Sequence, residues 1–264
     1  RSIYANHLFE GYTIVDWCYQ QEPFSIIWAV RSDGKLLGFT WMKEHDVWAW
    51  HLHDVGGVVE SIVSIPGTTA DEVYMVVKRT VNSEVVRYIE RLTLPDEFVY
   101  VDSAKTYENI TDVITGLDHL EGETVRAVAD GKYVYDGLVV NGGSITIPRA
   151  ANSVVVGLPY SGYIQTLPIT YEADGNISTG SRRKVTELVI DVLESFGGKY
   201  GTDEDHMYEF NYDDNEMFTG VLRQNLDSGY DYYGQVTIQQ DKPFPFKILT
   251  WTVGVAHGDT NRTK

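Results

Sequence analysis

Short segments rich in β-branched and aromatic residues alternate with turn-forming residues along most of the chain. Four such segments follow one another near the N-terminus, at residues 26–31, 36–42, 47–53 and 58–65. Asp33-Gly34 marks a hairpin between the first two, because glycine adopts positive φ without steric cost. Four consecutive antiparallel strands form a meander, which is the unit of a β-propeller blade. The pattern therefore predicts a propeller-like meander.

The segments around this meander complete a first domain, residues 1–95. Residues 1–22 predict a short amphipathic helix and an irregular lead-in. Pro23 ends the lead-in, since the residue before a proline avoids the helical region. Two further apolar segments, 72–79 and 85–92, predict a second β unit that stops at a proline.

A second domain is assigned to residues 96–172. Residues 96–118 predict a connector with one helical turn near 108–114. Four short strands are then expected, at 124–128, 132–140, 144–147 and 154–158. Short strands separated by glycine- and proline-containing turns indicate a small inserted domain that resembles a β-barrel.

The third segment, residues 173–264, is expected to supply strands that complete the sheet begun at 24–95, since closure over a long range removes an open edge. Residues 184–194 are interpreted as a strand, although their periodicity also permits a helix. Residues 173–182 are interpreted as a Gly/Ser/Asn-rich linker and 197–234 as a polar, acidic stretch. Two further strands are expected at 234–240 and 248–255.

Composition supports the β prediction and limits the possible partners. The 264 residues include 18 Tyr, 6 Trp and 9 Phe, which favour strands. The net charge of −17 argues against tight nucleic-acid binding, which needs a cationic surface. An acidic wall would instead repel DNA phosphates and let DNA pass, and the same charge also serves solubility.

The chain has no long apolar run and one cysteine. No apolar stretch approaches the ~18 residues of a membrane helix, so no membrane partner is expected. Cys18 is the only cysteine, which excludes an intrachain disulfide, and its aromatic neighbours favour a small buried side chain over a nucleophile. A start at Arg1 and an end at Lys264 suggest a piece of a longer protein.

The strand at 47–53 carries two candidate sites. His51 and His53 point to one face and could begin a zinc site with Asp54, but no third or fourth ligand has suitable spacing. The favoured interpretation is a polar, solvent-facing pair. The opposite face then carries a core stripe of Trp48, Trp50 and Leu52, whose tryptophans could alternatively stack on sugars.

Acidic residues gather in one stretch of the third segment. They are Asp203, Glu204, Asp205, Glu209, Asp213, Asp214 and Glu216, beside His206. Carboxylates at this density could hold calcium, but the spacing of an EF-hand is missing, so a solvated loop is favoured. No carboxylate pair stands out for glycoside hydrolysis, and no nucleophile elbow, P-loop or dinucleotide fingerprint occurs. No catalytic, cofactor-binding or metal-binding residue and no cofactor is therefore predicted.

Six short motifs resemble, in their order, the tail nozzle or tail tubular B-type structural proteins of short-tailed bacteriophages. They are DWCYQQEP at 16–23, WAVRSDG at 28–34, WHLH at 50–53, YIERL at 88–92, GLDHLEG at 116–122 and VGLPY at 156–160. The resemblance is strong over 16–170 and weak beyond. The N-terminal part of such proteins is missing here, and 197–234 matches nothing in the family.

The resemblance implies a virion protein on a propeller-like body. It implies a homo-oligomeric ring, usually of six subunits, that contacts the portal-side adaptor and tail fibres or spikes. Genome DNA would pass through without specific binding, and the subunits would assemble in the host cytoplasm. The function expected is thus a component of the phage tail nozzle, not an enzyme.

Two other functions are left open by the residues. The aromatic residues and carboxylates would also suit a carbohydrate-binding or carbohydrate-cleaving β module. The acidic stretch would suit a calcium-stabilised adhesion module.

Overall fold

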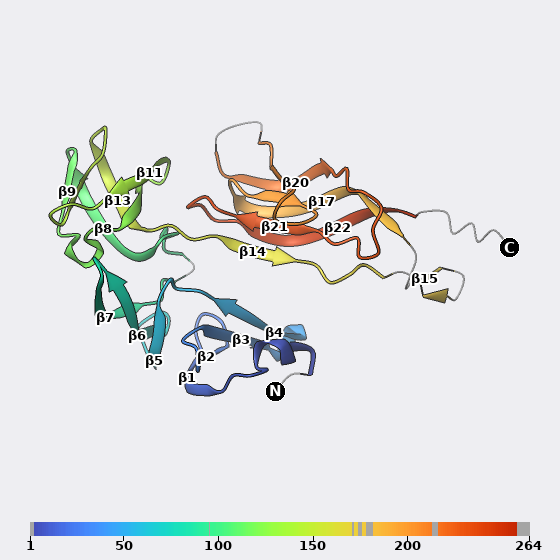
Figure 1. The fold of residues 1–264 in the computed structure, drawn as a ribbon, viewed down its shortest axis with the longest axis horizontal. Coiled ribbons are helices and arrows are strands. Elements are labelled where there is room, and N and C mark those ends of the chain that lie inside the picture. The colour runs from blue at the N-terminus through green and yellow to red at the C-terminus, as the bar shows by residue number, and fades with distance from the viewer. Residues whose placement is uncertain are drawn as a thin grey trace. The chain divides into compact units, whose positions relative to one another are not determined.

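The chain is mainly β, as predicted, with antiparallel sheets throughout (Figure 1). The computed structural model describes residues 3–94, 96–170, 172–173, 176–177, 182–212 and 216–257. These residues contain three short 3-10 helices, η1 (Ile3–Leu8), η2 (Lys43–His45) and η3 (Asp118–Leu120), and no α-helix. None of the helices in the described part of the chain is long and apolar enough to cross a membrane. The chain divides into two compact units, residues 1–159 and 160–264.

The first unit begins with two facing sheets. The first has the order β1-β2-β3-β4 and the second β5-β6-β7. Their strands are β1 (Ile14–Gln20), β2 (Ile26–Arg31), β3 (Leu36–Met42), β4 (Val47–His53), β5 (Val58–Ile65), β6 (Glu72–Val81) and β7 (Glu84–Arg91). Trp28, Val30 and Leu36 from the first sheet share a buried cluster with Val59 and Met75 from the second.

The composition of the first sheet corrects two expectations. β1 occupies the lead-in expected within 1–22 to be irregular, and β5, expected as the fourth strand of the meander, belongs to the second sheet. Trp17 pairs with Ala29 on β2, while the Asp16 carboxylate accepts a hydrogen bond from the Ile62 backbone N–H at 3.0 Å. The second layer forms because the apolar inner face of one sheet must be covered by another.

The rest of the first unit is a second layered region around its own core. The strands are β8 (Asp102–Ile110), β9 (Val113–Thr115), β10 (Thr124–Ala129), β11 (Tyr133–Val139), β12 (Ser144–Thr146) and β13 (Ala151–Leu158). They form the sheets β11-β10-β13-β8 and β12-β9, which enclose Ile114, Leu117, Leu120 and Val156. No sheet of the described residues closes on itself into a barrel or a propeller.

The connector expected at 96–118 is instead largely strand. β8 pairs along its length with β13, where Tyr107 lies opposite Val154. Most β8 side chains are exposed or half-buried because the strand lies at the edge of its sheet. An edge strand needs few apolar residues, so its sequence carries little signal of its own.

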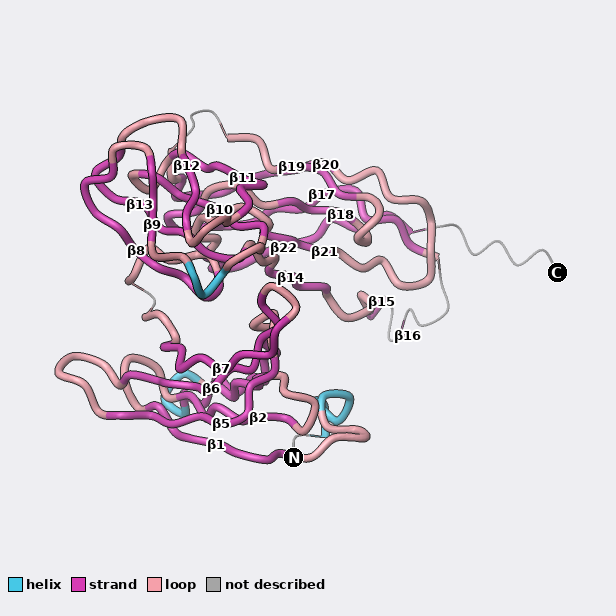
Figure 2. Tube along the Cα trace, turned by 60° about the vertical axis from the view of Figure 1, so that its left-hand side comes forward, coloured by secondary structure: helices cyan, strands magenta, loops and turns pink. Residues whose placement is uncertain are grey.

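The second unit is built from two sheets around one core. Its strands are β14 (Gly162–Gln165), β17 (Arg183–Ser195), β18 (Lys199–Gly201), β19 (Met207–Glu209), β20 (Phe218–Asn225), β21 (Thr237–Gln240) and β22 (Lys247–His257). The sheets have the orders β14-β21-β18-β19 and β20-β17-β22, and their strands are drawn in magenta in Figure 2. Leu188, Ile190, Tyr200 and Ile238 lie in the core between them.

This arrangement confirms one expectation and corrects another. Residues 184–194 form the strand β17, as predicted. The stretch 197–234 was expected to contain little strand, but its described residues include the three strands β18, β19 and β20. The strands within 183–257 pair with one another and with β14, and they do not join the sheet begun at 24–95. The linker was expected at 173–182. Two paired two-residue strands, β15 (Glu172–Ala173) and β16 (Asn176–Ile177), lie at its start. Apart from residue 182, the rest of the linker lies outside the described residues.

Candidate functional site

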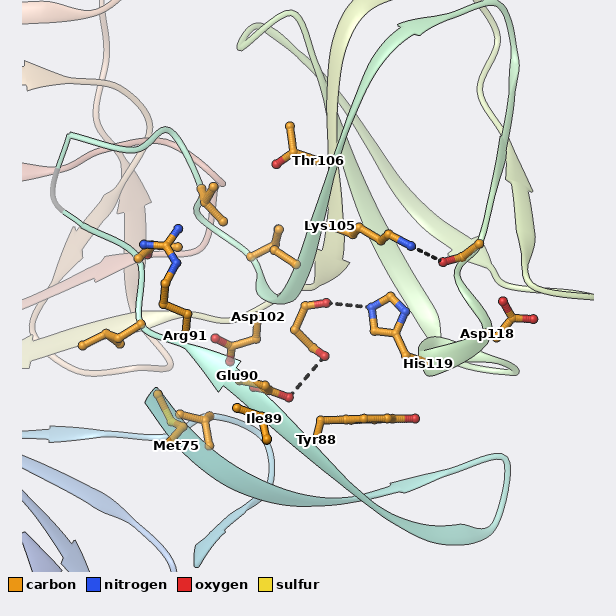
Figure 3. A pocket seen from close by; sticks show the side chains of 18 residues that line it. Met75, Tyr88, Ile89, Glu90, Arg91, Asp102, Lys105, Thr106, Asp118 and His119 are labelled. Carbon is orange, nitrogen blue, oxygen red and sulfur yellow. Dashed lines mark hydrogen bonds between the residues drawn. The ribbon is translucent and has the colours of Figure 1, made fainter. Parts of the chain in front are cut away.

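A cavity of about 660 Å³ lies in the first unit between β7, the start of β8 and η3 (Figure 3). Its walls carry several ionisable side chains, so it is a candidate functional site of the first unit. Glu90 comes from β7, Asp102 from the start of β8, and His119 from η3.

A bidentate ion pair lies beside this cavity. Arg79 Nε and Nη2 donate to the two carboxylate oxygens of Glu90 at 2.6 and 2.7 Å, and Nη1 donates to the Val55 carbonyl at 2.6 Å. The Arg79 side chain is 3% exposed and that of Glu90 16%. A buried arginine is tolerated only with such partners, so this pair joins β6 to β7.

Asp102 is the most perturbed acid in the cavity. Burial raises its carboxyl pKa to about 6, and the positive charge of Arg79 only partly opposes this effect. The next residue, Ser103, has a positive φ of 48°. Its hydroxyl donates to Glu90 at 3.3 Å, and its carbonyl accepts from His119 Nε2 at 3.1 Å. A carboxyl group with a pKa near neutrality can exchange protons at physiological pH.

The hydrogen bonds of the cavity walls hold neighbouring parts of the chain together. Glu90 uses both oxygens on Arg79, His119 bonds to backbone, and Lys105 donates to the Gly116 carbonyl at 2.9 Å. A general acid or base must face a substrate, whereas Glu90 bonds to Arg79, and His119 and Lys105 bond to backbone carbonyls. The geometry supports a structural role for the cavity walls.

The sequence offered one clue to this network. Along β6, buried residues alternate with less buried ones, and Arg79 takes a buried position between Val77 and Val81. A charged residue at an inward position of an alternating strand predicts a buried partner. Nothing in the sequence indicated that the partner would be Glu90.

The histidine pair on β4 faces inward, which corrects the expected solvent-facing position. His51 Nδ1 lies 2.6 Å from His53 Nε2, and His51 Nε2 lies 3.0 Å from the Thr40 hydroxyl. Both rings pack edge-on against Trp28, with centroids 5.7 and 5.1 Å from it. Burial lowers the pKa of both imidazoles, and with the added effect of His51 it lowers that of His53 to about 4.

The tryptophan side of β4 is correspondingly turned outward. Trp48 is 62% exposed and Leu52 48%, so the expected core stripe is wrong for both. Trp50 is half-buried and packs against Phe9 and Phe39, at centroid distances of 4.9 and 4.8 Å. Alternation distinguishes two faces of a strand, but the position of the second sheet decides which face is buried.

An exposed apolar surface results on the first sheet, which we call the outer face. Its exposed members are Trp17, Tyr19, Trp41, Trp48 and Leu52, from β1, β3 and β4. Register places Trp41 opposite Trp48 and Leu37 opposite Leu52. Ala5 and Phe9 cover Ala29 and Leu37 in the middle of this face, so its exposed side chains lie on β1, on β4 and at the end of β3. Exposed apolar side chains of this size on a folded protein can mark a contact surface.

The other expected candidates carry no clustered site. Asp203 accepts hydrogen bonds from His206 Nδ1 at 2.7 Å and from the Asp205 backbone at 3.0 Å, while Asp213 and Asp214 lie outside the described residues. In the part of the chain that the structure describes, no three His, Cys, Asp or Glu side chains gather as a metal site. Burial raises the pKa of the Cys18 thiol to about 11, which fits a structural cysteine.

No protein-family model matches the chain, and no curated protein sequence matches it. The likeness of its motifs to tail nozzle proteins therefore stays a prediction.

Proposed function

We propose that this chain is a structural subunit of the tail nozzle of a short-tailed bacteriophage, without enzymatic activity. The observation that carries the proposal is that polar side chains of the nozzle-like motifs form hydrogen bonds within the protein. Several of these side chains bond to the protein's own backbone and side chains and join its strands together.

Two polar motif residues, Gln20 and Glu121, illustrate this use. Gln20 accepts from Trp28 Nε1 at 2.9 Å and donates to the Asp71 carbonyl at 3.0 Å, which ties β1 to β2 and to the start of β6. The Glu121 carboxylate accepts from the backbone N–H groups of Gly142 and Gly143 at 3.0 and 2.6 Å. Such bonds add rigidity, which a subunit of a tube needs.

The outer face and the charge fit a ring subunit. Exposed tryptophans on β1 and β4 offer a contact area for a neighbouring copy, and β1 and β4 are the edge strands of their sheet. The net charge of −17 would keep DNA phosphates from adhering to a channel wall. In a ring, expected to hold six copies, the meanders would act as propeller-like blades, and the small β region after them would be an inserted barrel-like domain.

The proposal places the chain in the virion tail, assembled in the host cytoplasm and in contact with the adaptor and with fibres or spikes. Particles produced from the genome that encodes it should contain the chain, and gold-labelled antibodies against it should mark the tail below the portal in electron micrographs. Purified particles that lack the chain, or label found only on capsids or free protein, would contradict the proposal.

A further inference from the structure

A cavity of about 510 Å³ opens in the second unit, where β14, β18 and β20 end. This volume lies within the range of roughly 300–1,000 Å³ that is typical of small-ligand sites. The walls come from Gln165, from the turn that contains Asp203, and from the loop at 226–235.

Three tyrosines line this cavity and remain accessible. Tyr208, Tyr230 and Tyr233 are 53%, 51% and 60% exposed. Each offers an apolar ring and a hydroxyl that can donate or accept a hydrogen bond. A pyranose has a matching surface, because its C–H face is apolar and its edge carries hydroxyls.

Carboxylates and amides supply the polar part of the wall. Asp203, Asp227 and Asp231 offer acceptors, and Gln165 and Gln235 offer amide groups. A polyol needs such a mixture of acceptors and donors, whereas an organic cation would be served by acceptors and ring faces alone.

The carboxylates of the cavity already have hydrogen-bond partners. Lys184 Nζ bonds to Asp227 at 2.5 Å, and His206 Nδ1 donates to Asp203 Oδ1 at 2.7 Å. Asp231 Oδ1 accepts hydrogen bonds from the backbone N–H groups of Tyr233 and Gly234, at 2.7 and 2.5 Å. The cavity therefore suits a neutral ligand better than a cation, and its carboxylates disfavour an acidic sugar.

The loop that carries two of the tyrosines is held in place by β17. Asp231 and Arg183 exchange two backbone hydrogen bonds, at 2.7 and 2.9 Å. The Ser228 hydroxyl donates to the Val185 carbonyl at 3.0 Å and accepts from the Val185 N–H at 2.8 Å. A preorganised loop loses little entropy when it binds a ligand.

We propose that this cavity is a binding site for a neutral saccharide, with Tyr230 and Tyr233 as the aromatic platform and Asp231 as a hydroxyl acceptor. The site is independent of a role in a tail, because it rests only on the geometry of the second unit.

Saturation-transfer NMR of the whole chain with a panel of neutral hexoses, N-acetylhexosamines and their oligosaccharides tests this site. At least one neutral saccharide should bind at millimolar concentration or below. Tyr230→Ala and Tyr233→Ala should each weaken that binding about tenfold or more, since truncation of an aromatic anchor removes most of its contact area. Matching uronic acids should bind more weakly than their neutral counterparts.

Tyr232→Ala is the matched control. Tyr232 lies between the two anchors in sequence and is 52% exposed, but it is not part of the cavity wall and lies under Arg182, 5.5 Å from the guanidinium carbon to the ring centroid. This variant should bind as the parent does. The proposal is overturned if no neutral saccharide binds, if all three variants bind equally, or if tetramethylammonium occupies the cavity in preference to every sugar.

Discussion

Burial acts in opposite directions on two ionisable side chains of the first unit. Burial lowers the pKa of His53 to about 4, so the folded protein binds fewer protons there than the unfolded chain. Burial raises the pKa of Asp102 to about 6, so the folded protein binds more protons there. Between these values the two groups change stability with opposite sign as pH falls. Their contributions can therefore be separated only by comparing variants.

His53→Asn isolates the histidine contribution. The unfolded imidazole takes up a proton near its ordinary pKa of about 6.5, so the parent loses stability as pH falls from there to about 4, by up to about 3 kcal/mol. The variant lacks this loss, and the gap in unfolding free energy between parent and variant should shift in favour of the variant between about pH 7 and pH 5. Urea unfolding at both pH values measures it.

His45→Asn serves as the control for this comparison, because His45 is exposed on η2. The change of the gap with pH should be larger for His53→Asn than for this control. Equal changes in the two variants would contradict an effect of the packing of His53 against Trp28.

At the scale of single elements, the hairpin of β18 and β19 depends on a glycine. Gly201 pairs with Met207 across the hairpin, and a Cβ added to it would overlap the backbone carbonyl oxygen of His206. Backbone cannot move aside as a flexible side chain can. The same hairpin carries Asp203 and Tyr208 into the proposed saccharide site.

Gly201→Ala should destabilise the protein by about 1–3 kcal/mol, as overpacked sites do. Gly162→Ala is a matched change on β14 in the same unit, where no atom lies within 4 Å of the added Cβ. It should leave stability nearly unchanged. Denaturant unfolding of both variants decides the point, and equal midpoints would mean that the hairpin is looser than its close backbone approach implies.

At the scale of the whole molecule, two properties oppose each other in self-association. The outer face offers exposed apolar side chains, while a net charge of −17 makes copies repel. Salt screens this repulsion, since the Debye length falls from about 10 Å at 0.1 M to about 3 Å at 1 M. Salt does not screen the apolar contact.

Light scattering should therefore detect more self-association of the chain as salt rises, and Trp48→Asp should abolish the increase. Leu167→Asp adds the same charge at a side chain that is 85% exposed, belongs to the second unit and is not a member of the outer face, and it should leave the increase intact. A similar loss in both variants would assign the effect to charge alone and remove the outer face as a contact surface.

Local patterns were sufficient for the class of fold and for many of its strands. The hairpin signal Asp33-Gly34 separates the paired strands β2 and β3 in the structure, with a glycine φ of 84°. The strand at 184–194 was predicted because its apolar residues alternate, and β17 is buried in that pattern. Such features depend on a few neighbouring residues, so the sequence alone can reveal them.

Only the tertiary structure decided which distant segments pair or pack against each other. β8 is polar and is a strand because β13 lies beside it, and β5 leaves the first meander because its apolar residues cover the inner face of that sheet. The same packing turned His51 and His53 inward and Trp48 outward. Alternation along one strand defines two faces, and only the layer packed against the sheet determines which of them is withdrawn from water.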